Sequence, residues 1–228
     1  MTFPLSEPIR VPLYNPPADT GLDLIHQDEA LLILNKPSGL LSVPGRGADK
    51  QDSLLTRARK HFADVECVHR LDMETSGLML LAHGKQAQRA LNLLFQQRQV
   101  HKQYEAIVDG KLKPRDGEIR LPLLCDWPNR PRQKIDYAHG KASLTHFRVL
   151  SHDVQQNTTR VALRPETGRS HQLRVHMQSL GHSILGDRLY ATPAARDRAP
   201  RLLLHASVLA FCHPLTGQQN QFYCHVPF

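Results

Sequence analysis

Two stretches of the chain place acidic, basic and polar residues where they could support chemistry. The first, His69-Arg70-Leu71-Asp72-Met73-Glu74-Thr75-Ser76-Gly77, runs directly into five apolar residues, 78–82. If residues 67–72 are extended, Arg70 and Asp72 point to the same side of the chain. A carboxylate at the edge of a core is partly desolvated, and a neighbouring guanidinium favours its charged form, as in many catalytic acids. The alternative is a simple turn, because the Asp, Thr and Ser side chains of this run favour local hydrogen bonds to the backbone.

The second stretch is basic and leads into an expected helix. It begins Pro165-Glu166-Thr167-Gly168 and continues with Arg169 in the first turn of the helix and Arg174 further along. Gly181 is placed to end the helix. The residues on one helical stripe are Leu173, His176, Met177 and Leu180. The pattern alone indicates a basic amphipathic helix.

Together the two stretches resemble motifs of the RluA-type pseudouridine synthases. The motif H-R-L-D-x-x-T-S-G, followed by an apolar strand, is complete at residues 69–77, and T-G-R-x-H-Q-L-R is complete at residues 167–174. The resemblance implies that Asp72 is the catalytic residue and that Arg174 pairs with it. It also implies that Arg70 fills the place left by the base that the enzyme extrudes from the RNA. The reaction exchanges no electrons and imports no group, so neither a cofactor nor a metal is expected.

A strand expected over residues 100–108 carries Lys102 and Tyr104 on one face, because strand side chains alternate. A tyrosine at such a half-buried position is ordinarily part of a core or its rim. The pair also matches the Lys-x-Tyr motif of the family, which implies that Tyr104 stacks on the extruded base. Stacking tolerates any base, so Tyr104 would hold the uracil without identifying it.

Two further family motifs are present. Residues 35–40 match N-K-P-x-G-L, and the resemblance implies a structural role for Lys36. Residues 202–206 match a motif whose leucine packs beneath the target base. The resemblance places that role on Leu204, although three consecutive leucines leave the register open.

The loop of residues 125–134 carries the only tryptophan, Trp127, among Arg130, Arg132 and Lys134. Cations interleaved with an aromatic ring suit an RNA backbone and an unstacked base, so we expect the three cations to contact RNA. The sequence leaves two roles open for Trp127: contact with RNA, or anchoring of the loop on the core. The string D-W-P-N-R-P also resembles one branch of the family. That branch acts on 23S rRNA and on the anticodon stem-loop of tRNA, which implies this pair of substrates.

Length and composition describe a folded, basic protein. The 228 residues are 40% hydrophobic and carry a formal charge of +8, which suits a polyanionic partner but does not separate RNA from DNA or an anionic membrane surface. No apolar run approaches the roughly 20 residues of a membrane span, and the N-terminus lacks a secretory pattern. The four cysteines are scattered without a Cys-x-x-Cys pair, so we expect reduced thiols in a cytoplasmic protein.

Other classes of protein fit the same residues less well. Fourteen histidines suggest a metal hydrolase, but there is no His-Glu-x-x-His, and His171 and His176 are five apart. The Gly-x-Ser-x-Gly turn of a serine hydrolase is absent. A noncatalytic RNA-binding protein would explain the charge and the aromatic residues, but not Asp72 and Arg174 within intact motifs. A synthase of the same family with a different RNA target remains open.

The apolar pattern predicts an α+β fold. Two further amphipathic helices are expected, one capped by Asp52 or Ser53 and the other over residues 85–98. The charged residues of the first helix are expected on a solvated face: Arg57, Arg59, Lys60 and His61. The resemblance implies a bent, mostly antiparallel sheet flanked by helices, with a central catalytic cleft.

Residues 1–21 are expected to form a proline-rich arm, and residues 22–228 the catalytic domain. Apolar residues such as Leu13 give the arm something to bury, so it is expected to drape over the body. The arm leaves no room for the S4-like RNA-binding module of many relatives. The domain would then find its RNA unaided, as a monomer, which favours short stem-loops.

Overall fold

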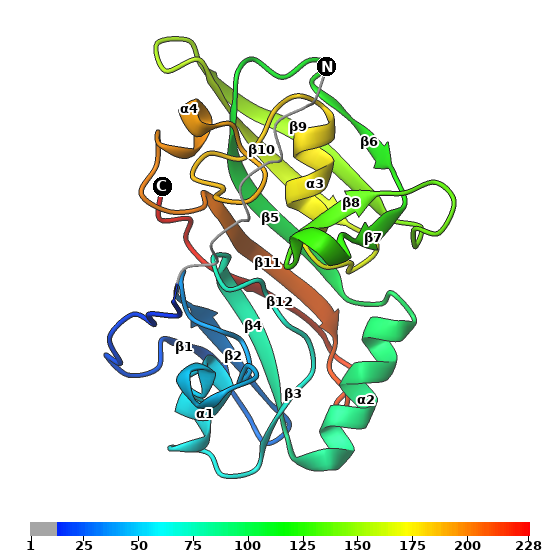
Figure 1. Ribbon diagram of the computed structural model, residues 1–228. Helices are drawn as coiled ribbons and strands as arrows, with labels where there is room; N and C mark the ends of the chain where they lie inside the picture. The colour runs from blue at the N-terminus through cyan, green and yellow to red at the C-terminus, as the bar shows by residue number, and fades with distance from the viewer. Residues whose placement is uncertain (1–12) are drawn as a thin grey trace.

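The computed structural model describes residues 13–228, which form strands, a few helices and ordered loops (Figure 1). The strands are β1 (Leu24–Gln27), β2 (Leu31–Lys36), β3 (Val65–Cys67), β4 (Ser76–His83), β5 (His101–Asp109), β6 (Asp116–Arg120), β7 (Leu123–Cys125), β8 (Gln133–Ile135), β9 (Leu144–Asp153), β10 (Thr158–Pro165), β11 (Leu204–Cys212) and β12 (Gln219–Tyr223). The helices are α1 (Leu54–Arg59), α2 (Gly84–Gln96), α3 (Gln172–Ser179) and α4 (Pro193–Arg196).

One ten-stranded sheet runs through both halves of the molecule in the order β1-β2-β4-β11-β5-β10-β9-β6, with β3 beside β4 and β12 beside β11. Strands β4 and β11 are parallel, and the other pairs of the sheet are antiparallel. Helices α1 and α2 flank one half, while α3 and the separate β7–β8 hairpin flank the other (Figure 1). The expected α+β fold with a mostly antiparallel sheet is confirmed.

Strand β4 is buried on both faces, as its continuous apolar run predicts. Leu78 and Leu80 belong to one apolar cluster, whereas Met79 and Leu81 belong to another on the opposite face. All four side chains are at most 1% exposed. This rigid strand directly follows the segment that contains Asp72, so it fixes one end of that segment.

Gly77 allows β4 and β11 to lie unusually close together. Its φ is +110°, and a Cβ at this position would lie 2.3 Å from the carbonyl oxygen of Ala206. Only glycine combines this φ with such an approach. The contact brings the first residues of β11, including Leu204, beside the segment that precedes β4.

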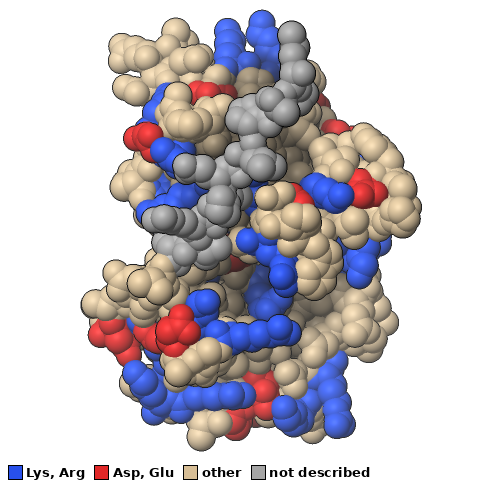
Figure 2. Space-filling view, viewed as in Figure 1, with Lys and Arg blue, Asp and Glu red and all other residues tan. Residues whose placement is uncertain are grey.

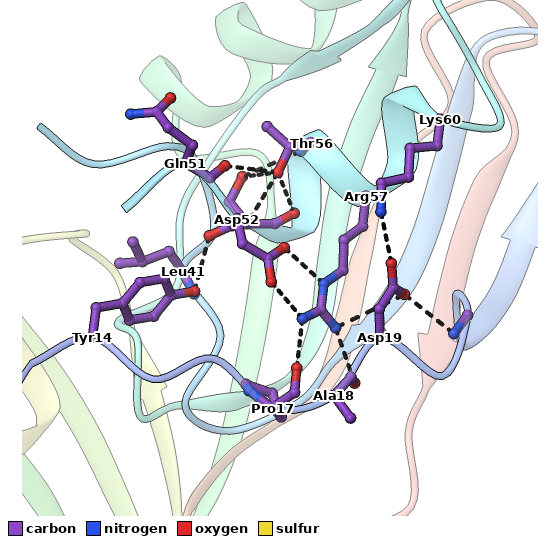
Figure 3. Close-up of polar contacts among 12 residues, drawn as sticks. Tyr14, Pro17, Ala18, Asp19, Leu41, Gln51, Asp52, Thr56, Arg57 and Lys60 are labelled. Carbon is purple, nitrogen blue, oxygen red and sulfur yellow. Dashed lines mark hydrogen bonds and ion pairs between the residues drawn. The ribbon is translucent and has the colours of Figure 1, made fainter. Parts of the chain in front are cut away.

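Arg57 lies in the interior, although its position on α1 had indicated a solvated face. Its side chain is 5% exposed and donates to both carboxylate oxygens of Asp52 at 2.9 and 2.7 Å (Figure 3). It also donates to the carbonyls of Pro17 and Ala18 at 2.5 and 3.2 Å. The expectation was wrong because the described part of the N-terminal segment covers this face of the helix.

The described part of the arm is held against the body by polar groups. The hydroxyl of Tyr14 donates to the carbonyl of Asp52 at 2.9 Å and accepts from the amide of Leu41 at 3.0 Å (Figure 3). Asp19 pairs with Lys60 at 2.8 Å. Leu13 is 90% exposed, so it does not bury as expected. Residues 1–12, with the other apolar residues of the arm, lie outside the described chain.

Replacing Arg57 by Ala should lower the free energy of unfolding by about 2 kcal/mol, because a buried fork of charge-assisted hydrogen bonds is lost. The matched control is Lys60→Ala, since the exposed Lys60–Asp19 pair joins the same helix to the same segment. An exposed pair contributes less than about 1 kcal/mol. Urea unfolding measures both values, and equal losses would contradict a special role for Arg57.

Candidate active site

A cavity of about 630 Å³ lies between the two halves of the molecule. Six of the residues singled out from the sequence line it, namely Arg70, Asp72, Tyr104, Arg169, Arg174 and Leu204. Figure 2 shows Lys and Arg side chains around the hollow at the centre of this face. The volume falls within the range that accommodates a small organic ligand, so one nucleotide would fit.

The segment that carries Asp72 is a loop. Strand β3 ends at Cys67, and residues 68–72 belong to no strand. The Nε2 of His69 accepts from the amide of Leu80 at 2.9 Å, and the amide of Thr75 donates to the carbonyl of Asp72 at 3.1 Å, which closes a turn at residues 72–75. Burial lowers the pKa of His69 to about 3, so its ring stays neutral and can accept. The segment is thus a turn, and Asp72 still faces the cavity.

Residues 36–42 form a cradle for this loop. The hydroxyl of Ser42 donates to the carbonyl of Leu71 at 2.7 Å and accepts from its amide at 3.0 Å. The amide of Gly39 and the Nζ of Lys36 both donate to the carbonyl of Met73, at 2.9 and 3.0 Å. The residues on either side of Asp72 are therefore fixed by the backbone and side chains of a neighbouring loop.

Lys36 is completely buried and donates to three carbonyls, those of Pro37, Leu40 and Met73, at 2.7 to 3.0 Å. Burial lowers the pKa of Lys36 to about 7, although Asp72 and Glu74 favour its protonation. These contacts agree with the structural role expected for Lys36.

The stability of the protein should therefore depend on pH through Lys36. In the unfolded chain a lysine has a pKa of about 10.4, so above pH 7 the unfolded state holds a proton that the folded state has lost. The free energy of unfolding should rise between pH 7 and 10, by at most about 1.4 kcal/mol per pH unit from this group. Lys36→Met should flatten the rise seen in urea unfolding, whereas Lys85→Met, at an exposed lysine, should not. Parallel profiles for all three proteins would contradict this.

Arg174 binds two carboxylates. Its Nη1 lies 3.5 Å from Oδ2 of Asp72, and its Nε and Nη2 donate to both oxygens of Asp187 at 2.8 and 2.7 Å. The side chains of Arg174 and Asp187 are 4% and 0% exposed, against 26% for Asp72. Burial disfavours the charge of Arg174, but the two carboxylates more than offset this and raise its pKa. Asp187 thus holds the guanidinium in place, and Asp72 retains room for a substrate.

Asp187 is a site residue that the sequence reasoning missed. The turn-rich run 181–190 gave no periodicity from which to place one carboxylate. Its Oδ1 also accepts from the amides of Leu189 and Tyr190, at 2.9 and 3.1 Å. Two backbone amides and the guanidinium of Arg174 thus compensate the burial of this carboxyl group.

Tyr104 and Leu204 supply the apolar wall of the cavity. They come from the paired strands β5 and β11, and Tyr104 packs against the apolar cluster that contains Leu204. Among the consecutive leucines 202–204, Leu204 is the one that lines the cavity. Burial and then the charge of Asp72 raise the pKa of Tyr104, so its phenol stays neutral. A flat, uncharged ring beside a leucine is a suitable surface for a planar base.

Arg169 was expected in the first turn of α3. In the structure it precedes the helix. The helix begins at Gln172, after His171 adopts a left-handed conformation with φ +53°. The side-chain oxygen of Gln172 accepts from the amide of Arg169 at 3.0 Å and from the hydroxyl of Thr167 at 2.7 Å, so it closes the preceding turn. Arg169 is left exposed on the cavity rim.

The loop of residues 125–134, here called the basic loop, lies beside the cavity and contributes Pro131 to its wall. Its cations and Trp127 do not line the cavity. Trp127 is 65% exposed, which rules out a role as a core anchor, and the guanidinium of Arg130 lies 4.4 Å from its ring centroid. The guanidinium of Arg132 lies 5.5 Å from the ring of Tyr190. Lys134 pairs with Asp136 at 3.4 Å.

Residues 13–228 contain no group of three or more His, Cys, Asp or Glu side chains arranged to hold a metal ion. Within the same residues, every helix is too short or too polar to cross a bilayer.

Comparisons with known proteins agree on one family. A family model described as RNA pseudouridylate synthase matches residues 30–179. The dual-specificity RNA pseudouridine synthase RluA of Escherichia coli strain K12 is 52% identical over 209 residues, which are 92% of this chain and 95% of the relative. RluA of Vibrio parahaemolyticus is 54% identical over 204 residues, covering 88% and 82%. Among solved structures, Human RNA Pseudouridylate Synthase Domain Containing 1 is similar with a TM-score of 0.78 and 29% identity, covering 94% of this chain and 87% of that one.

Proposed function

The chain belongs to the RNA pseudouridylate synthase family and is an RNA pseudouridine synthase, and we propose that Asp72 is its catalytic residue. One observation carries the proposal. The Asp72 carboxylate lies on the cavity wall, 3.5 Å from a guanidinium that a second, fully buried carboxylate holds in place. The family assignment leaves no basis for the noncatalytic alternative.

Pseudouridine formation breaks the C1′–N1 bond of uridine and joins C1′ to C5 of the same uracil. The hydrogen lost from C5 is balanced by one gained at N1, so the product is an isomer. Asp72 acts either as the nucleophile at C1′ or as the base that removes a sugar proton. Arg174 pairs with the carboxylate, while Tyr104 and Leu204 hold the base as it turns. Arg70 and Arg169 lie on the rim, where an extruded nucleotide would enter.

We further propose that the substrates are a 23S rRNA helix and the anticodon stem-loop of tRNA. Relatives more than half identical to this chain are named dual-specificity synthases. We propose a monomer, because the residues named for the reaction all line one cavity of this chain, and a cytoplasmic enzyme, because rRNA and tRNA are found in the cytoplasm. Residues 22–228 would form the catalytic domain, with residues 1–21 as its arm.

Purified protein and short transcripts test this proposal. Stem-loops from 23S rRNA and from tRNA anticodon arms are incubated with the enzyme, digested and analysed for pseudouridine. We expect product from one uridine in each class of stem-loop and none from scrambled loops. Product from a single class would refute dual specificity but leave the enzyme assignment intact.

The basic loop should supply part of the RNA affinity. Arg130→Ala combined with Arg132→Ala removes two cations, which should weaken binding and reduce the slope of log K against log salt by about 1.6. Arg196→Ala with Arg198→Ala is the matched control, because these two arginines lie at α4, away from the β7–β8 hairpin (Figure 1). Titrations from 50 to about 200 mM salt measure both slopes. Equal slopes in the two double variants would show that the basic loop does not contribute specifically to the RNA-binding surface.

A further inference from the structure

Tyr190 joins the basic loop to the wall of the active site. The backbone amide of Gln133 donates to the hydroxyl oxygen of Tyr190 at 2.7 Å, and the same oxygen lies 2.7 Å from Nδ1 of His171. The ring of Tyr190 also lies 5.1 Å from the guanidinium carbon of Arg174. Tyr190 is 4% exposed, so this chain of contacts is sheltered from water.

The direction of each hydrogen bond follows from which atom carries the hydrogen. The Gln133 amide can only donate, so the Tyr190 oxygen accepts from it. Within residues 13–228, Nδ1 of His171 is the only remaining partner for the buried hydroxyl, which must donate to it. Burial raises the pKa of Tyr190 to about 12 and lowers that of His171, so the hydroxyl keeps its hydrogen and the imidazole is neutral. The single ring hydrogen of His171 therefore lies on Nε2.

This Nε2–H group is free to bind a substrate. His171 lines the cavity together with Asp72, and its Nε2 is neither bonded nor buried among residues 13–228. We propose that His171 donates a hydrogen bond from Nε2 to a backbone oxygen of the target nucleotide, and that Tyr190 is a positioning residue that fixes the required tautomer. The acceptor is a flanking phosphate oxygen or the ribose hydroxyl. The ligand rests on the proposed function, because Asp72 marks where the target sugar would lie.

The tautomer can be tested without RNA. Nitrogen-15 NMR of the imidazoles distinguishes a nitrogen that carries hydrogen from a bare one. We expect Nε2 of His171 to be protonated and Nδ1 bare at neutral pH. Tyr190→Phe removes the hydroxyl and should yield a mixture of tautomers. A hydrogen on Nδ1 in the unaltered protein would overturn the proposal, whatever its activity.

The contact with RNA can be tested by a cycle of protein and RNA changes. Stem-loop binding is measured in an Asp72→Asn background to prevent turnover, with RNA that carries either a methylphosphonate beside the target uridine or a 2′-deoxy target. We expect one of these changes to weaken binding about tenfold. His171→Asn should weaken the unmodified RNA equally and show no further loss with that change. The RNA change that causes no further loss in His171→Asn identifies the acceptor. If the losses in binding free energy from the protein change and the RNA change add fully for both RNAs, the proposal is overturned.

Two further variants separate the contact from folding. Asn accepts the left-handed conformation at position 171, and His171→Gln, whose amide nitrogen can approach the place of Nε2, should recover part of the affinity. His139→Asn is the control for the same exchange at a histidine that is 81% exposed. No recovery by His171→Gln together with loss in His139→Asn would indicate a general effect on the fold and refute the contact. Failure of the wild-type enzyme to form pseudouridine would instead refute the proposed function.

Discussion

Asp72→Asn should bind stem-loop RNA about as well as the unaltered enzyme and form pseudouridine at least about 10³-fold more slowly. Asparagine has nearly the same shape but can act neither as a nucleophile nor as a base. The fold should persist, because Arg174 retains its two bonds to Asp187 and the loop around residue 72 is held by its backbone. Single-turnover assays with nucleoside analysis measure the rate, and equilibrium titration measures the binding.

Glu74→Gln provides the matched control for this experiment. It removes a carboxylate charge two residues away, from a side chain that does not line the cavity. Its rate should stay within about threefold of the unaltered enzyme, since no contact with the reacting atoms is lost. Comparable losses in the two variants would show that charge in the loop matters and the identity of residue 72 does not.

Arg174→Met should both destabilise the protein and inactivate it. The change leaves the fully buried carboxyl group of Asp187 without its cation, a situation that costs about 3–5 kcal/mol of unfolding free energy. It also removes the positive charge that lies 3.5 Å from the Asp72 carboxylate. Urea unfolding and the single-turnover assay measure the two effects separately.

The double variant Arg174→Met with Asp187→Asn distinguishes stability from catalysis. A neutral amide removes the unpaired charge, and its oxygen can still accept from the amides of Leu189 and Tyr190. Stability should recover substantially while the rate of product formation stays low. Recovery of both would mean that Arg174 serves the fold alone.

The sequence predicted the parts of the molecule that local pattern determines. The apolar run after residue 77 indicated a strand buried on both faces, and β4 is one. The alternation over residues 100–108 placed Lys102 and Tyr104 on one side, and both line the cavity. The family motifs indicated that Asp72 and Arg174 would meet, and their side chains do.

Such local patterns do not predict contacts between residues far apart in the sequence. Arg57 sits among charged residues on a short helix, and its burial depends on carbonyls of residues 17 and 18, forty positions away. The partnership of Arg174 with Asp187 depends on how the chain after α3 returns to the site, which no periodicity encodes. Helix α3 likewise begins after the left-handed residue His171, and the side chain of Gln172 closes the preceding turn, so Arg169 lies outside the helix.

The catalytic role of Asp72 is tested most directly in cells that lack this gene. Pseudouridines are mapped across total RNA after the gene is restored either in its natural form or as Asp72→Asn, at equal protein levels. We expect the natural form to return pseudouridine at one 23S rRNA site and in tRNA anticodon arms, and the variant to return none. Full restoration by the Asp72→Asn protein would contradict that role.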